Sequence, residues 1–292
     1  MYLLHKPVAL AERMREAIPR MSRGQRMLAE YLRSNIEAAA FLTAKQLGAQ
    51  VGLSESSVVR FAISLGYDGW PDLQSQLRAE VKARLSTVSR LRQSAARSSR
   101  SPEIDIMSGD MHNIRATIAT LEREVFAKAV DAVSAASRVF IVGTRSARSL
   151  ALFLGFCLEM CGKCVTYVGT GPRSEIEDVS STQPDDVVIG ISFARYSRST
   201  VECFSHASTQ RCTTIALTDS LMSPLAEMAD ITLTAKVDID SFFESLVAPL
   251  SLINALVGRL AQQHEQKTLD TLERFEELCA EYRVYWEPTK GK

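Results

Sequence analysis

The chain has 292 residues, of which 46% are hydrophobic and 23% are charged. This composition is typical of a folded protein and argues against an intrinsically disordered chain. No apolar run approaches the roughly 20 residues that a membrane helix needs, and charged residues interrupt the first segment, so we expect neither membrane insertion nor a secretory signal. The sequence therefore predicts a cytoplasmic protein, with length for one large domain or two ordinary ones.

The net charge of zero conceals an asymmetry along the chain. Residues 1–100 carry 16 Lys and Arg against 8 Asp and Glu, whereas residues 101–292 carry 18 against 26. The basic part could bind a polyanion such as nucleic acid, and the acidic part could not. A basic surface is also often only solvated, so the charge by itself does not decide between these alternatives.

The cysteines indicate reduced thiols in a protein core. Most of them lie among apolar residues, as buried free cysteines do. Cys161 and Cys164 have the Cys-x-x-Cys spacing of a redox or zinc half-site, but no second Cys or His pair at ligand spacing accompanies them. We therefore predict no metal site and no cofactor. The six cysteines are Cys157, Cys161, Cys164, Cys203, Cys212 and Cys279.

Residues 1–85 show a helical pattern with short connections. Ser22 is a plausible N-cap of a helix in which "QRMLAEYL" places apolar residues at helical spacing. The following "STVSRLRQSAARSSRSP" has few large apolar residues and ends in a proline, which is typical of a linker or a frayed helix. We predict an N-terminal domain over 1–85, a linker over 86–110 and a second domain over 111–292.

Beyond residue 110 the pattern changes to alternating strands and helices. A helical segment precedes the short apolar run "RVFIVG", and further strands are predicted at "CVTYVG", "DVVIGIS", "TTIALTDS" and "DITLTA". Helical segments separate several of them, which predicts right-handed βαβ units and a parallel sheet flanked by helices. Residues 245–285 are again helical, with Pro249 tolerable only in the first turn.

The segment "FLTAKQLGAQVGLSESSVVRFAISLGYDGWPDLQSQL" has the layout of a helix-turn-helix. Thr43 can cap the first helix, Gly52 supplies the tight turn and Ser54 caps the second helix. A glycine inside a helix costs about 1 kcal/mol relative to alanine, so Gly48 indicates that the two helices pack closely. The predicted buried face of the second helix consists of Val58, Val59, Ala62 and Leu65.

The exposed face of the second helix carries small hydroxyl groups and a positive charge. Glu55, Ser56, Ser57 and Arg60 lie on it, and hydroxyls with an arginine near a helix N-terminus suit phosphate and base-edge contacts in a major groove. The alternative is a solvated face on a helical hairpin. The basic balance of this part of the chain favours DNA.

The segment "LTAKQLGAQVGLSESSVVRFAISLGYDGWPDLQ" closely resembles the N-terminal DNA-binding domain of RpiR-type bacterial transcriptional regulators. In these proteins the helix-turn-helix is followed by an aromatic residue and a Leu-Gly-Tyr segment like residues 65–67. The resemblance implies that the residues meeting DNA are Thr43, Ser54, Ser56, Ser57 and Arg60.

Residues from about 125 to 265 are similar to the sugar isomerase (SIS) domain that follows the linker in this family. The loops after "RVFIVG" and "DVVIGIS" and the segment "TIALTDSLMSPLAEMADITL" match it in order. The resemblance implies two domains, an all-α helix-turn-helix N-terminal domain and an α/β SIS domain with a parallel sheet flanked by helices. It also implies binding of a phosphorylated sugar.

The residues themselves also favour an anion site at these two loops. Ligands of open α/β sheets bind at the carboxyl ends of strands, and helix N-termini attract anions. Serine hydroxyls can complete such a site, although any one of these serines could instead be a helix cap. The predicted effector-binding residues are Thr144, Arg145, Ser146, Ser192, Arg195, Tyr196 and Ser197.

The chain departs from the SIS pattern in both loops. Arg145 stands where a glycine is usual after the first strand, and Ala147 replaces the usual serine. In the second loop Arg195 again replaces a glycine. Guanidinium groups bind carboxylate or phosphate in bidentate fashion, so we expect a small acidic effector, either a sugar phosphate or a sugar acid. Alternatively, both arginines point to solvent or pair with acidic residues across a dimer interface.

Together these features predict a transcriptional regulator of a carbohydrate or sugar-acid catabolic operon. A repressor is favoured over an activator because it is the commoner kind. The expected partners are double-stranded operator DNA, a small anionic effector and further copies of the chain in a homodimer or homotetramer that forms through helical faces, including residues 245–285. We expect no enzymatic activity and no catalytic residue. One alternative is a phosphosugar isomerase with a helical accessory domain, with His206 or Glu244 as its base. A non-DNA interaction module is the other.

Overall fold

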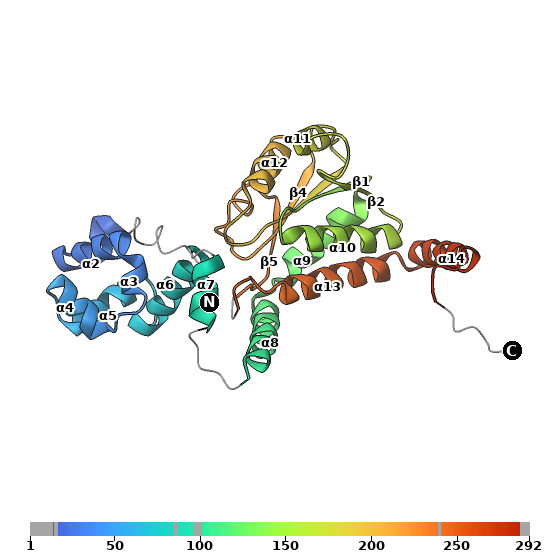
Figure 1. Cartoon of the computed structure of the whole chain (residues 1–292). Coiled ribbons are helices and arrows are strands. Elements are labelled where there is room, and N and C mark those ends of the chain that lie inside the picture. Colours follow the sequence, from blue (N-terminus) through green and yellow to red (C-terminus); the bar gives the residue numbers. More distant parts are fainter. Residues whose placement is uncertain (1–13, 15–16, 85–86, 96–100, 239–240, 287–292) are drawn as a thin grey trace. The chain divides into compact units, whose positions relative to one another are not determined.

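The computed structural model describes residues 14, 17–84, 87–95, 101–238 and 241–286 (Figure 1). The chain divides into two compact units, residues 1–100 with 238–243 and residues 101–237 with 244–292. The predicted linker, 86–110, spans this division and contains helix α7 (Thr87–Ala95) and the start of α8 (Pro102–Thr120). Part of that segment, 96–100, lies outside the described residues.

The N-terminal unit is all-helical, as predicted. Ser22 caps α2 in a reciprocal capping box with Gln25, which satisfies two backbone groups at the helix start. On α5 the buried residues are Val58, Phe61 and Ala62, with Leu65 just beyond, so Phe61 takes the place predicted for the half-buried Val59. Besides α7, the elements are η1 (Ile18–Arg20), α2 (Arg23–Ser34), α3 (Ile36–Ala39), α4 (Ala44–Val51), α5 (Glu55–Ser64) and α6 (Trp70–Arg84).

The C-terminal unit contains a five-stranded sheet in the order β2-β1-β3-β4-β5, in which every neighbouring pair is parallel. Val139 of β1 pairs with Val187 of β3, and Val187 pairs in turn with Thr213 of β4. The predicted parallel sheet is therefore confirmed. The strands are β1 (Arg138–Val142), β2 (Cys164–Tyr167), β3 (Val187–Ile191), β4 (Thr213–Thr218) and β5 (Ile231–Thr234).

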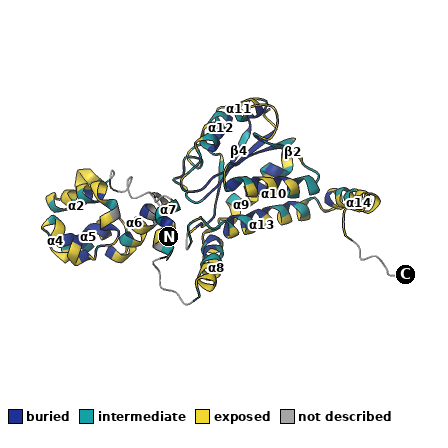
Figure 2. Cartoon of the chain, viewed as in Figure 1, coloured by how far each residue is buried: buried dark blue, intermediate teal, exposed yellow. Residues whose placement is uncertain are grey.

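Helices cover both faces of this sheet (Figure 1). Successive residues of a strand point to opposite faces. Val139 and Ile141 pack with α9 (Arg123–Ala135), α10 (Ala147–Met160) and α13 (Val247–Gln263). Phe140 and Val142 instead pack with α11 (Glu175–Val179) and α12 (Arg198–Ser208). The sheet is therefore buried on both sides, and Figure 2 shows exposure mainly on the outer faces of the helices.

Two elements differ from the sequence-based expectation. The short helix α11 lies between β2 and β3, where no helix was predicted; a capping box between Ser174 and Glu177 starts it. The predicted run over 245–285 is two helices, α13 and α14 (Glu265–Glu281), which meet at His264. His264 leaves the helical conformation, and its ring bonds the hydroxyl of Ser134 on α9. Pro249 lies in the first turn of α13, as predicted.

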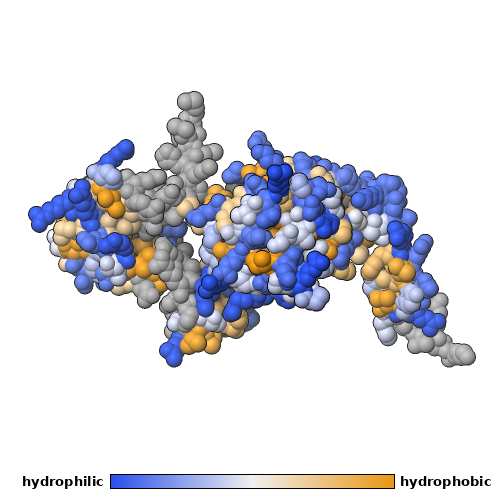
Figure 3. Space-filling model, turned by 90° about the horizontal axis from the view of Figure 1, so that it is seen from above, coloured by the Kyte–Doolittle hydropathy of each residue, from blue (hydrophilic) through white to orange (hydrophobic). Residues whose placement is uncertain are grey.

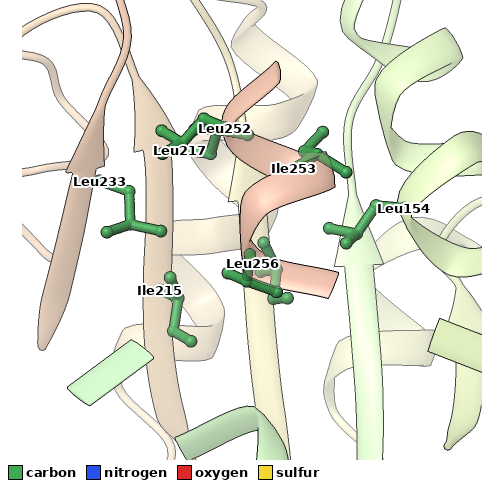
Figure 4. A pocket seen from close by; sticks show the side chains of 8 residues that line it. Leu154, Ile215, Leu217, Leu233, Leu252, Ile253 and Leu256 are labelled. Carbon is green, nitrogen blue, oxygen red and sulfur yellow. The ribbon is translucent and has the colours of Figure 1, made fainter. Parts of the chain in front are cut away.

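A small void lies between α10, α13 and the sheet (Figure 4). Only leucine and isoleucine side chains line it, so it offers no hydrogen bond to a ligand and is a packing gap of the core. Its lining consists of Leu154, Ile189, Ile215, Leu217, Leu233, Leu252, Ile253 and Leu256. Within the described residues, no helix is both long and apolar enough to span a membrane.

Replacing Gly48 by alanine tests the packing of α4 against the start of α5. A Cβ at Gly48 would lie 2.6 Å from the carbonyl oxygen of Leu53, and backbone cannot move away as a flexible side chain could. We expect Gly48→Ala to lower the free energy of unfolding of the N-terminal unit by about 1–3 kcal/mol. Calorimetric unfolding of the full chain measures this.

The matched control is Gly258→Ala on α13, where nothing lies within 4 Å of an added Cβ. This change should stabilise by about 0.5–1 kcal/mol, because it only raises helix propensity. A stabilising effect of Gly48→Ala as well would contradict the close contact.

Candidate functional site

The first helix of the predicted motif begins and ends as the sequence indicates. Thr43 caps α4: its side chain accepts from the backbone N–H of Gln46, and the Gln46 side chain accepts from the backbone N–H of Thr43 at 2.9 Å. Gly52 ends the helix in the left-handed conformation with φ of 75°, which glycine adopts at little cost. The backbone N–H of Leu53 then donates to the carbonyl of Gly48 at 2.7 Å. These bonds define the turn between α4 and α5.

Four of the five predicted DNA-contact residues form one connected cluster at the N-terminus of α5. The hydroxyl of Ser54 lies 3.0 Å from that of Ser56 and 2.9 Å from that of Ser57. Arg60 lies one turn further along α5, and its guanidinium group donates to the Ser57 hydroxyl at 3.4 Å. Ser54, Ser56 and Arg60 are exposed. Hydroxyl groups and a guanidinium are thus presented together at a helix N-terminus, an arrangement that suits a phosphate contact. Thr43 lies apart from them, at the start of α4.

In the C-terminal unit the strand order reverses at β1. The chain runs from β1 to β2 on one side of β1, and β3 then pairs on the other side. This order is that of flavodoxin-like sheets, whose ligands bind at the carboxyl ends of the strands flanking the reversal. The loops after β1 and β3 are therefore the expected place for a ligand. All the predicted effector residues lie on these two loops.

Hydroxyl groups tie the two loops together. Thr144, after β1, donates to the hydroxyl of Ser197 at 2.6 Å and lies 2.8 Å from that of Thr200. The backbone N–H of Ser197 donates to the Ser192 hydroxyl at 3.3 Å. Thr200 is buried and was not predicted as a site residue. Its position three residues after Ser197, in the first turn of a helix, is the signal that could have identified it.

The serines at the starts of the two helices do not act as side-chain caps. Ser146 and Ser197 are the N-cap residues of α10 and α12, but neither makes a side-chain capping bond. Ser146 donates its hydroxyl to Oε1 of Glu244 at 2.6 Å. Helix capping therefore does not account for these two hydroxyls. Backbone N–H groups at both helix starts keep the positive end of the helix dipole.

Both arginines that depart from the SIS pattern have a left-handed backbone. Arg145 has φ of 58° and Arg195 has φ of 67°, and both side chains are exposed. This conformation costs a non-glycine residue about 1–2 kcal/mol, which glycine would avoid. The loops thus keep the backbone that suits glycine while carrying a guanidinium group.

Tyr196 contributes to the framework of the second loop. Its hydroxyl donates to Oδ1 of Asp219 at 3.0 Å, and the backbone N–H of Ala194 donates to Oδ2 at 3.3 Å. Burial raises the pKa of the Asp219 carboxyl above its usual range. Burial and the neighbouring Asp219 carboxyl likewise raise the pKa of the Tyr196 phenol. Asp219, which follows β4, therefore anchors the loop after β3.

Of the two candidate bases, Glu244 accepts a hydrogen bond from Ser146, which is one of the predicted effector residues. His206 instead lies 2.8 Å from the Ser180 hydroxyl, at the end of α11. The six cysteines are free thiols, and four of them are buried. Across the described part of the chain, no three His, Cys, Asp or Glu side chains are grouped so that they could hold a metal ion.

Comparisons with known proteins agree with this arrangement. Residues 8–84 match the helix-turn-helix domain of the rpiR family, and residues 133–259 match the SIS domain. An HTH-type transcriptional regulator of Caldanaerobacter subterraneus subsp. tengcongensis is 24% identical over 267 residues, which cover 88% of this chain and 92% of that protein.

Two solved structures resemble the chain. The sugar isomerase domain of an RpiR transcription factor from Sphaerobacter thermophilus has a TM-score of 0.59 and 28% identity, covering 61% of this chain and 99% of that one. The NanR protein of Vibrio vulnificus, solved in complex with ManNAc-6P, has a TM-score of 0.56 and 20% identity over 93% of this chain and 98% of that one. The chain belongs to the RpiR family of transcriptional regulators, with an N-terminal helix-turn-helix domain and a C-terminal SIS domain.

Proposed function

We propose that this regulator represses a carbohydrate or sugar-acid catabolic operon and that a small anionic effector, bound to the SIS domain, controls its affinity for operator DNA. The observation that carries the proposal is the pair of hydroxyl-rich loops after β1 and β3, which the hydrogen bonds of Thr144 join. Each of the two loops also carries an arginine whose backbone has the left-handed conformation that favours glycine. The same chain carries the helix-turn-helix domain.

The charge of the loops supports an anionic effector. Neither α10 nor α12 has an acidic residue in its first turn. The carboxylates that reach the two helix starts, Glu244 at Ser146 and Glu175 at Ser199, come from other segments, as expected where a positive dipole end attracts negative charge. Arg145 and Arg195 add two permanent charges beside them. The complex of the Vibrio vulnificus protein with ManNAc-6P supports a sugar phosphate. The arginines in place of glycine equally suit a sugar acid, whose carboxylate they could bind in bidentate fashion.

Apolar side chains exposed on two helices of the SIS domain support a homodimer or homotetramer. Figure 3 shows apolar surface on α14, the helix that precedes the C-terminal residues. Burial of such surface against another copy would stabilise the assembly and pair two helix-turn-helix domains on a palindromic operator. The exposed side chains are Leu152, Phe153 and Phe156 of α10 and Leu269, Leu272 and Leu278 of α14.

The cluster at the start of α5 is the proposed DNA contact, and Arg60→Ala tests it. Loss of one phosphate contact should weaken binding to a duplex selected from a random library and reduce the slope of log affinity against log salt concentration by about 0.9 per subunit. Fluorescence anisotropy over a salt series measures both.

Arg33→Ala on α2 is the matched control, because it removes the same charge from an exposed arginine that lies outside the cluster. It should leave the slope nearly unchanged. Equal effects of both substitutions would mean that only the overall charge matters and that α5 is not the contact.

Arg195→Gly tests the proposed effector site with two independent readouts. Loss of a charge-assisted hydrogen bond should lower the affinity for the effector by about 10- to 100-fold. The melting temperature should stay constant or rise, because glycine relieves the left-handed backbone. A thermal-shift screen of sugar phosphates and sugar acids identifies the effector, and calorimetric titration then measures the affinity.

Arg198→Ala is the control for this change. Arg198 is three residues away on α12 and is a fully solvated arginine paired with Glu202, so its loss should change neither readout. Unchanged effector affinity in Arg195→Gly would exclude a role for Arg195 in binding.

The alternative function, a phosphosugar isomerase, rests on the carboxylate of Glu244 beside Ser146, where a general base could stand. We expect no turnover, because an isomerase has no need of a DNA-binding domain. Incubation of the purified protein with aldose phosphates, followed by detection of the ketose product, tests this. Turnover that Glu244→Gln abolishes would favour the isomerase.

A further inference from the structure

A carboxylate of the chain itself lies at the start of α10. Oε1 of Glu244 accepts the hydroxyl hydrogen of Ser146, the N-cap residue of α10, at 2.6 Å. The first turn of α10 contains no acidic residue. Glu244 therefore supplies from a distant segment the negative charge that a helix N-terminus attracts. An effector anion bound at the loop after β1 would need the same place.

The residue after Glu244 connects this point to α8. The hydroxyl of Ser245 donates to Oδ1 of Asp110, in the middle of α8, at 2.5 Å. It also accepts from the backbone N–H of Val247, the first residue of α13, at 3.3 Å. Adjacent residues thus contact the start of α10 and the side of α8. A shift of Glu244 away from Ser146 would pull on the bond to Asp110.

The C-terminal half of α8 is held independently of this bond. Thr117 accepts from the backbone N–H of Lys236 at 2.9 Å and donates to the carbonyl of Asn113 at 2.8 Å. Both Asn113 and Thr117 are buried. The half that precedes Asp110 begins at Pro102, and its side chains Ile104 and Met107 are exposed. It is also the half that the chain enters from the N-terminal unit. Loss of the Asp110 contact would therefore loosen this half.

We propose that Glu244 is an internal anion that occupies the effector site of the free protein, and that an effector anion displaces it and thereby releases Ser245 from Asp110 and loosens the N-terminal half of α8. This rests on the proposed function of the same site. The effector anion and the Glu244 carboxylate repel each other at one helix start, so the two arrangements exclude each other. The signal then passes to the helix that follows the connection to the DNA-binding domain.

The first experiment needs no ligand. Hydrogen–deuterium exchange of the full-length protein should be faster in Glu244→Ala than in the wild type, by about tenfold, for the amides of residues 102–112. Residues 113–120 and strand β4 should be unchanged. Ser245→Ala should give the same pattern, because it breaks the same link one residue later.

The matched control is Glu202→Ala, which removes an exposed glutamate of α12 that pairs with Arg198. It should leave exchange in α8 at the wild-type rate. Wild-type exchange of residues 102–112 in both Glu244→Ala and Ser245→Ala would overturn the proposal. DNA binding and effector binding could both persist in that case, so the proposed function would survive.

The second experiment uses inorganic phosphate as the probe anion. Glu244→Gln keeps the size of the side chain and an acceptor for Ser146 but removes the competing charge, so phosphate should bind about tenfold more tightly than to the wild type. Ser245→Ala removes the bond to Asp110 that phosphate otherwise has to break, so it should also raise the affinity for phosphate, but by less than Glu244→Gln does. Phosphate should accelerate exchange of residues 102–112 in the wild type and not in Glu244→Ala.

Equal phosphate affinity of the wild type and Glu244→Gln would overturn the displacement, and so would absence of phosphate binding to both. Failure of the proposed function gives a different result. In that case phosphate would bind more tightly to Glu244→Gln and loosen α8 as expected, but neither phosphate nor any sugar phosphate or sugar acid would change the affinity for DNA.

Discussion

The parallel pairing of β1 with β3 is the interaction on which the proposed ligand site depends. The chain places β2 on one side of β1 and returns to build β3 on the other. In this register Val142 pairs with Gly190, so the two strands end at nearly the same level and their loops leave the sheet side by side. The bonds of Thr144 to Ser197 and Thr200 can form only because of this pairing. The helices α10 and α12 begin directly after these two loops, and helix N-termini attract anions.

The framework around the proposed site is polar and mostly half-buried, and its hydrogen bonds hold the loops in place. Asp219 bonds both Tyr196 and the backbone of Ala194, so the loop after β3 is anchored to the end of β4 on both sides of Arg195. A half-buried carboxyl group that accepts several hydrogen bonds is costly to disturb. This anchoring explains how Arg195 can keep a left-handed backbone that would relax in a freer loop.

Features that follow from local rules could be predicted from the sequence. Thr43 and Ser54 are caps with the required side chains, Gly52 adopts the left-handed turn, and the apolar runs of β1 and β3 are typical of strands buried on both faces. Helix α11 was missed because five residues are too few for a periodic pattern. The break at His264 has neither glycine nor proline to mark it, and it depends on a contact with α9.

The contacts that define the site could not be predicted, because they join residues far apart in the chain. Ser146 and Glu244 are 98 residues apart, and Ser245 and Asp110 are 135 apart. Ser146 and Ser197 stand at helix starts and Ser192 directly follows β3, but the hydroxyl partners of these serines depend on the tertiary fold. The sequence therefore predicts where an anion could bind, and the structure adds the partners to which these side chains are bonded.

The proposed competition between Glu244 and an effector anion bears on how an effector could control DNA binding at all. A ligand shifts a conformational equilibrium only by the difference in its affinity for the two states, so an anion that filled the loops without moving anything would regulate nothing. With Glu244 at the start of α10, an effector anion has unequal affinity for the two arrangements, because it binds well only where Glu244 has left. In the proposed mechanism the Glu244 carboxylate lowers the affinity of the free protein for the effector. The free energy lost in this way equals the coupling free energy between effector binding and the loosening of α8. A site without Glu244 would bind the anion more tightly and transmit less.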